Sequence, residues 1–135
     1  MPSARRAIGI AMILALNSCS ARGPKPIALG AECAACGMSI GDLRFGCERE
    51  SGGWLQYDSI ECLLADRKTG PVWLADYDSQ ALAPPESLWI VKGDFPSPMG
   101  GGLAAFRSRV AADRVAAETR GTVSRLEGVT PRPSP

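Results

Sequence analysis

A strand, strand, helix order that occurs twice along the chain constrains the fold most strongly. In the first passage, residues 43–48 alternate apolar and polar side chains, residues 51–53 predict a turn, and residues 54–57 predict a second strand. Asp58-Ser59 then offers an N-cap for a helix over 60–68. A helix that follows a hairpin can cover one face of it, so this passage predicts one ββα unit.

The second passage repeats the order with longer connections. Residues 72–76 predict a strand, and residues 88–92 predict its partner. The helical pattern over 110–119 is the clearest in the chain, and a short strand over 122–126 is expected to complete the sheet. The two passages predict one small α+β domain built from two ββα units.

The N-terminus has the pattern of an export signal. Arg5 and Arg6 precede an apolar run over 7–16, which is about ten residues against the roughly twenty that span a bilayer. The four residues that end in Cys19 resemble the lipobox of bacterial lipoproteins, in which this cysteine carries the lipid. The alternative is ordinary cleavage nearby, which would leave Cys19 as a free thiol.

These patterns divide the chain into a lipoprotein signal peptide over 1–18, a lipid-anchored tether over 19–30, a domain over 31–129 and a disordered tail over 130–135. Removing Arg5 and Arg6 from fifteen basic residues leaves thirteen, against fourteen acidic ones, so the mature chain is close to neutral. Because no basic block with interleaved aromatics occurs, nucleic acid is not expected as a partner.

Cys33 and Cys36 form a C-x-x-C pair, a spacing that serves metal binding, thiol-disulfide exchange or a structural disulfide. Gly37 and Met38 follow and predict a turn rather than the start of a helix. A thiolate and a thioether on one turn are soft donors, which favour Cu(I). The chain contains no histidine, so it cannot form the usual catalytic zinc site.

A second thioether, Met99, lies between Pro98 and three glycines. Its spacing fits either a metal ligand or a side chain that fills a gap at the surface. The glycine run lacks the lysine and hydroxyl residue of a phosphate-binding loop. Without histidine, and with scattered acidic residues, no catalytic constellation is recognisable, and the chain is predicted not to be an enzyme.

Cys47 and Cys62 allow three interpretations. Both fit small buried hydrophobic residues, and they could pair as a disulfide in an oxidising compartment. They could also join Cys33 and Cys36 in a structural zinc site that resembles a treble clef. Asp58 is interpreted as a helix cap.

Several motifs together resemble the NosL family of bacterial lipoproteins, which act as copper chaperones for nitrous oxide reductase assembly. The resemblance spans roughly 31–129 and includes two methionine motifs in a characteristic order. The motifs are the lipobox, Cys36-Gly37-Met38, Tyr57-Asp58 before a helix, the strand over 72–76, Pro98-Met99-Gly100 and Ala105-Phe106.

The resemblance implies a non-enzymatic Cu(I) metallochaperone on the periplasmic side of a bacterial membrane, anchored through Cys19 to either the inner or the outer membrane. By position, Cys36 and Met38 would belong to its first metal motif and Met99 to its second. If a relative uses a histidine to complete its site, that ligand is missing here, and Cys33, water or a group from the partner would have to replace it. The implied recipient is nitrous oxide reductase, and a homodimer that shares one ion is left open.

Two other classes stay open from the residues. A zinc-stabilised structural or interaction module predicts four metal-bound cysteines. A periplasmic dithiol-disulfide oxidoreductase predicts an activated Cys33 in the C-x-x-C pair.

Overall fold

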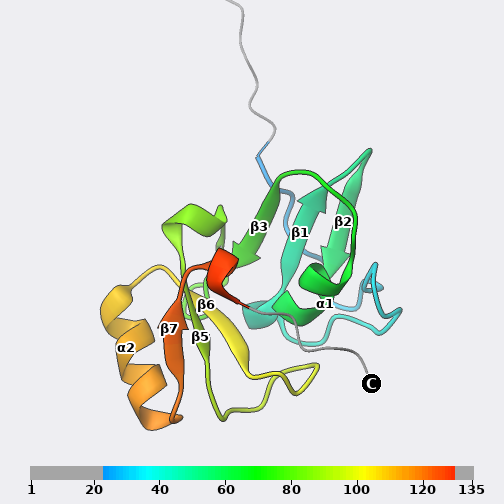
Figure 1. Ribbon diagram of the computed structural model, residues 1–135. Coiled ribbons are helices and arrows are strands. Elements are labelled where there is room, and N and C mark those ends of the chain that lie inside the picture. The colour runs from blue at the N-terminus through cyan, green and yellow to red at the C-terminus, as the bar shows by residue number, and fades with distance from the viewer. Residues whose placement is uncertain (1–22, 130–135) are drawn as a thin grey trace, which may run out of the picture.

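The computed structural model describes residues 23–129, which form two antiparallel sheets and two helices (Figure 1). The α+β class predicted from the sequence is therefore confirmed. The predicted signal peptide, Cys19 and the predicted tail over 130–135 lie outside the described residues. Within 23–129, no helix has the length and apolar character needed to cross a membrane.

The first sheet has the strand order β2-β1-β3-β4. The central strand β1 (Cys47–Glu50) pairs antiparallel with β2 (Trp54–Tyr57) on one side and with β3 (Val72–Ala75) on the other. Strand β4 (Leu82–Ala83) extends the sheet beyond β3. The chain passes from β2 to β3 through helix α1 (Ile60–Ala65).

The second sheet has the strand order β6-β5-β7. Its central strand β5 (Trp89–Lys92) pairs antiparallel with β6 (Leu103–Phe106) and β7 (Thr122–Ser124). Helix α2 (Arg109–Glu118) connects β6 to β7 and packs against all three strands, on the outer side of this sheet in Figure 1. Each sheet is therefore built from a ββαβ unit.

The division between the two units differs from the sequence prediction. The strand over 72–76 was expected to pair with the strand over 88–92, but β3 pairs with β1 and closes the first sheet. The partner of β5 is β6, which the sequence analysis missed. All four residues of β6 are buried. A strand that is covered on both faces loses the alternation of apolar and polar residues by which strands are recognised.

The two largest shifts of predicted element boundaries lie in the first unit. Residues 43–45 form a short 3-10 helix, and the strand begins only at Cys47. Helix α1 ends at Ala65 rather than at residue 68, because Asp66 has an extended backbone and its carboxylate accepts hydrogen bonds from the Tyr57 hydroxyl and the Lys68 N–H. The buried Arg49 guanidinium donates to the carbonyls of Leu63 and Asp66, so it satisfies the C-terminal end of this short helix.

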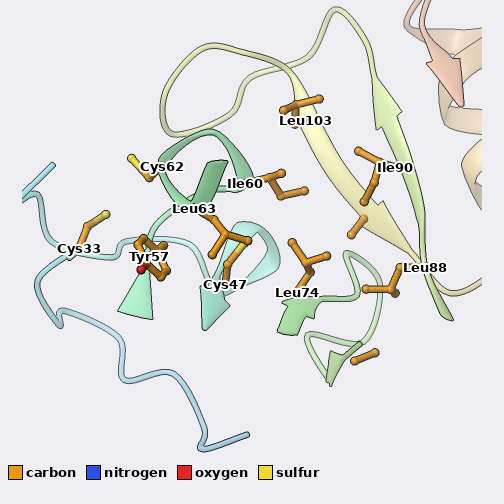
Figure 2. Close-up of a cluster of buried hydrophobic side chains, with 12 residues drawn as sticks. Cys33, Cys47, Tyr57, Ile60, Cys62, Leu63, Leu74, Leu88, Ile90 and Leu103 are labelled. Atoms are coloured by element: carbon orange, nitrogen blue, oxygen red, sulfur yellow. The ribbon is translucent and has the colours of Figure 1, made fainter. Parts of the chain in front are cut away.

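The larger core lies between the units (Figure 2). It takes side chains from α1, from both sheets and from the loop that carries Cys33. A second core lies between the second sheet and α2. The neighbours Ile90 and Val91 on β5 belong to different cores, which shows that the second sheet is covered on both faces.

Asp76 joins the two units. Its carboxylate accepts hydrogen bonds from the Ser79 hydroxyl and from the backbone N–H of Arg107 at 2.9 Å, and the N–H of Tyr77 donates to the carbonyl of Ala105 at 2.7 Å. Burial alone would raise the pKa of Asp76, but these donors outweigh burial and lower it. Asp76 is therefore a charged acceptor that fixes the end of β3 to β6.

The last part of the segment predicted as a tether packs on the first sheet. The N–H of Lys25 donates to the buried carboxylate of Glu48 at 2.8 Å, and the side chain of Gln56 donates to the carbonyl of Pro26. These contacts cover the face of β1 and β2 that points away from the larger core. Lys25 and Pro26 therefore contact the first sheet directly.

Candidate metal centre

Four side chains that could bind a metal, from two segments of the chain, meet beside the larger core. They are Cys33, Cys36, Asp58 and Cys62, and their candidate ligand atoms all lie within 4.8 Å of one another. Three of these side chains are buried, and Cys36 is exposed. We call this group the inner cluster. Ligands of one tetrahedral ion lie roughly 3.5–4 Å apart, so small side-chain movements would close the cluster around an ion.

A tight turn positions the two cysteines of the C-x-x-C pair. The N–H of Cys33 donates to the carbonyl of Met38 at 2.8 Å, and the N–H of Gly37 donates back to the carbonyl of Cys33 at 2.9 Å. Gly37 has φ 75°, a value that suits glycine. The turn directs Cys33 into the core, where its side chain is 1% exposed, and leaves Cys36 at the surface.

The start of helix α1 supplies the other two members. The hydroxyl of Ser59 accepts from the N–H of Cys62 at 3.2 Å, so Ser59 is the N-cap and Asp58, which was interpreted as a cap, is free for another role. Asp58 is 2% exposed, and its Oδ2 accepts from the Cys36 thiol at 3.8 Å. Its Oδ1 is buried and has no hydrogen-bond partner among residues 23–129.

A second buried carboxylate lies next to the cluster. Both oxygens of Glu61, on the first turn of α1, are buried and lack a hydrogen-bond partner within the described part of the chain. Gly101 packs directly against this carboxylate, since a β-carbon at that position would collide with it. Buried carboxylates are normally paired with a positive charge or coordinate a metal. The region is therefore rich in uncompensated acceptor groups.

The surroundings raise the pKa of the Cys36 and Cys62 thiols, which favours their protonated form when no metal is bound. Burial is the main cause that raises the pKa of Cys36, and the nearby Cys33 and Asp58 add to it against the lowering effect of the Met38 N–H. Burial and the hydrogen bond with Asp58 likewise raise the pKa of Cys62. A metal that binds here must displace protons, which leave to the solvent.

Both predicted methionine ligands are at the surface, Met38 with 52% and Met99 with 42% of the residue exposed. Met38 lines an open hollow of about 330 Å³, and Asp58, Ser97 and Pro98 line other parts of it. Met99 follows Pro98 directly, although its own side chain is not among the lining residues. The structure thus brings the two methionine-bearing segments to one hollow, and Asp58 connects that hollow to the inner cluster.

The methionine-bearing loop reaches the first unit from the second. It connects β5 to β6 and is closed at its base by a hydrogen bond of 2.9 Å from the N–H of Gly93 to the carbonyl of Gly102. Within the loop, the Ser97 hydroxyl accepts from the N–H of Gly102 at 2.9 Å. Through Gly101 the loop rests on α1 of the first unit.

Cys47 is separate from the inner cluster. It is fully buried, its thiol donates to the carbonyl of Phe45 at 3.5 Å, and burial raises its pKa strongly. In Figure 2 it lies between Leu63 and Leu74, away from the end of the core that holds Cys33 and Cys62. The predicted zinc set of four cysteines is therefore not assembled as proposed, because Asp58 takes the place expected for Cys47.

Asp58 and Cys62 were not predicted from the sequence as copper ligands. A usable signal was present, since Asp58 precedes the N-cap and Cys62 lies in the first turn of the same helix. Residues separated by about one helical turn can face one site. The spacing indicates a shared site only in combination with the C-x-x-C turn, which lies against this helix in the fold.

The fold is similar to a solved copper chaperone. The chain matches the crystal structure of the copper chaperone NosL from Shewanella denitrificans with a TM-score of 0.68 and 18% sequence identity, covering 80% of this chain and 96% of that one. No protein-family model matches the sequence. The search of curated proteins likewise gave no significant match. The resemblance expected from the sequence is thus confirmed in three dimensions, and this chain has the fold of the copper chaperone NosL.

Proposed function

We propose that this protein is a Cu(I) metallochaperone that binds copper through cysteine and methionine sulfur and delivers it to a copper enzyme. The observation that carries the proposal is the position of Cys36. Its thiol is exposed next to Met38, yet it belongs to a cluster of buried donors. An exposed thiolate can hold Cu(I) while an incoming ligand from a recipient attacks from the solvent side. The NosL-like fold supports the proposal.

In this proposal Cys36, Met38, Met99 and Cys33 are the copper ligands, as expected from the sequence. Cys36 and Met38 lie on one turn, and the loop that carries Met99 borders the same hollow as Met38. A chaperone must bind its ion without trapping it, and a small sulfur site at the surface meets that condition. The role is one of binding and transfer, so no catalysis is assigned.

A zinc-stabilised module is the second candidate, because the inner cluster offers four donor atoms, the number that a structural zinc site uses. It would contain three cysteines and Asp58 instead of four cysteines. The dithiol oxidoreductase is disfavoured, because its expected nucleophile Cys33 is buried and cannot reach a protein disulfide.

Native mass spectrometry with Cu(I) and Zn(II) offered together separates these candidates. The reduced chain from residue 20 onward, which keeps every described residue, is used without oxygen. We expect one Cu(I) per chain, or one shared by two chains, with zinc excluded. One tightly held Zn(II), with copper bound loosely or in scattered amounts, would replace the chaperone with the zinc module.

Competition with a Cu(I) chelator tests the central residue. Cys36→Ser should lower the Cu(I) affinity by more than about 100-fold, because loss of a ligand costs more than loss of a group that only supports one. Lys25→Ala is the matched control and should bind like the parent, since Lys25 contacts the sheet through its backbone N–H. A Cys36→Ser protein with parental affinity would remove the copper assignment.

We further propose that Cys19 carries a lipid that holds the domain on the periplasmic side of a bacterial membrane. The lipobox resemblance supports this, and two or three acyl chains are enough for stable anchoring. Cys19→Ser should move the exported protein from the membrane fraction to the soluble fraction. Unchanged membrane association would contradict lipidation at this residue.

The proposed recipient is nitrous oxide reductase, on the basis of the NosL resemblance in sequence and fold. Incubation of the copper-loaded protein with copper-free reductase should restore reductase activity faster than the same amount of Cys36→Ser. Equal rates for the two proteins would indicate that free copper, rather than this protein, supplies the enzyme.

A further inference from the structure

We infer that Cu(I) occupies two positions in this protein, an inner position on Cys33, Cys36, Cys62 and Asp58 and an outer position on Cys36, Met38 and Met99, with Cys36 shared between them. This inference rests on the proposed function and adds to it a division of labour. The inner position retains the ion, and the outer position presents it to the recipient.

The types of donor atom indicate which of the two positions binds Cu(I) more tightly. The inner position offers three thiols and one carboxylate within 4.8 Å of one another. The outer position offers one thiol and two thioethers, which carry no charge. Thiolate is the stronger donor for Cu(I), because it adds electrostatic attraction to soft sulfur bonding. A single Cu(I) is therefore expected in the inner position.

The buried carboxylate of Asp58 points to a cation at the inner position, and that of Glu61 lies on the same helical turn. Asp58 is almost completely buried, and among residues 23–129 one of its carboxylate oxygens and both of those of Glu61 have no hydrogen-bond partner. No described Lys or Arg forms a salt bridge with either residue. Leaving buried carboxylates uncompensated is costly, and a bound cation would remove much of that cost. The buried Asp58 carboxylate is thus placed as a ligand at the end of the core that holds Cys33 and Cys62.

The two positions are connected through Cys36 and Asp58. Cys36 is the exposed member of the inner cluster, and its thiol donates to Asp58. Asp58 in turn lines the hollow that Met38, Ser97 and Pro98 border. A ligand from a recipient can therefore enter at the methionine side without opening the core around Cys33 and Cys62.

Movement between the positions is a ligand exchange without a change of oxidation state. The bonds from Cu(I) to the sulfurs of Cys33 and Cys62 break, and bonds to the thioether sulfurs of Met38 and Met99 form. The bond to the Cys36 sulfur is kept throughout. Each released thiolate takes up one proton from water, which reverses the proton loss that accompanied binding.

Selenium labelling distinguishes the positions in the intact site. Residues 20–135 contain two methionines, Met38 and Met99, so selenomethionine places selenium at the outer position alone once the initiator methionine is removed. With one Cu(I) per chain, X-ray absorption at the copper edge should show sulfur neighbours and no selenium. Copper-selenium scattering at this loading would overturn the inner position as the resting place. This test needs no substitution in the core.

Variants then test the division of labour. Cys33→Ser with Cys62→Ser should lower the Cu(I) affinity by at least about tenfold, speed release to a chelator, and produce copper-selenium scattering. Met38→Leu with Met99→Leu should keep the affinity within about threefold and slow release by about tenfold, because the exit position is lost. Circular dichroism before loading identifies any variant that fails to fold, and Asp58→Asn, which keeps the side-chain volume, then replaces the double cysteine variant.

Failures of the two proposals are distinguishable. If the parent binds no Cu(I), the proposed function fails. If the parent binds Cu(I) but the cysteine variant and Asp58→Asn both retain and release it like the parent, the inner position is wrong and the chaperone proposal stands. If the methionine variant releases copper at the parental rate, the outer position has no role in exit.

Discussion

The two ββαβ units share one topology but have different roles. The first unit has a tight β1–β2 turn and a helix of six residues, and it holds Cys62 and Asp58. The second unit has a long loop between β5 and β6 and a helix of ten residues, and its contribution near the site is the loop that carries Met99. Two similar frames thus contribute differently to the candidate site, since one holds the inner cluster and the other supplies the loop beside it.

The difference shows how a small domain can leave donors without partners and remain stable. The second sheet is covered on both faces and closes around its own core with α2. The first sheet shares the larger core, one end of which holds buried thiols and carboxylates. Buried polar groups without partners are expected at functional sites.

The largest effect on the free energy of unfolding is expected at the base of the long loop in the second unit. Gly102 has φ 65° and lies at the base of the loop, close to Gly93. A β-carbon at Gly102 would collide with the carbonyl of Gly93. Gly102→Ala should lower the free energy of unfolding by about 3 kcal/mol or more, because left-handed strain and a backbone clash add. Urea unfolding followed by tryptophan fluorescence measures the change.

The equivalent turn of the first unit provides the control. Gly52 in the β1–β2 turn has φ 68°, but no atom of the described part of the chain lies within 4 Å of a β-carbon added there. Gly52→Ala should cost about 1–2 kcal/mol from backbone strain alone. Equal losses for the two variants would contradict the view that the loop of the second unit is the more tightly constrained connection.

A smaller loss of stability is expected from variants that weaken the support of each helix, and it should differ between α1 and α2. The short helix α1 depends on Arg49 of β1, whose guanidinium donates to the carbonyls of Leu63 and Asp66. Arg49→Leu should lower the free energy of unfolding by about 1.5–3 kcal/mol, because charged hydrogen bonds to buried carbonyls are lost. Helix α2 has an exposed ion pair between Arg109 and Asp113 at 2.8 Å instead.

The ion pair of α2 is the matched comparison. Asp113→Ala should cost only about 0.3–0.5 kcal/mol, as is usual for an exposed pair one turn apart. Urea unfolding of both variants tests the contrast. A loss for Asp113→Ala as large as that for Arg49→Leu would show that α1 depends on its support no more than α2 does.

Local patterns predicted much of the first unit correctly. Strand β2 has the predicted bounds, and α1 starts at the predicted residue, because a turn, an alternating strand and an N-cap are encoded by neighbouring residues. The pairing of β3 with β1 was not predicted, since a strand carries no local mark of its partner. Strand β6 was missed because burial on both faces removes alternation.

The candidate site could likewise be predicted only in part from the sequence. The C-x-x-C turn, the neighbouring thioether and the absence of histidine are properties of the sequence, and they indicated a soft-metal site without reference to the fold. The separation of Cys47 from Cys62 and the inclusion of Asp58 depend on where α1 lies against the turn. Residue type fixes the chemistry available, whereas distances between segments far apart in the chain fix which donors can share an ion.

By itself, then, the sequence determined the α+β class, most of the helices and strands, and the sulfur donors, because these follow from short-range spacing and side-chain chemistry. Only the tertiary structure decided that β3 belongs to the first sheet, that Asp58 and Cys62 join Cys33 and Cys36, and that the loop before Met99 borders the hollow next to Met38. The physical reason is that packing of the shared core sets these relations, and packing depends on residues distant in the sequence.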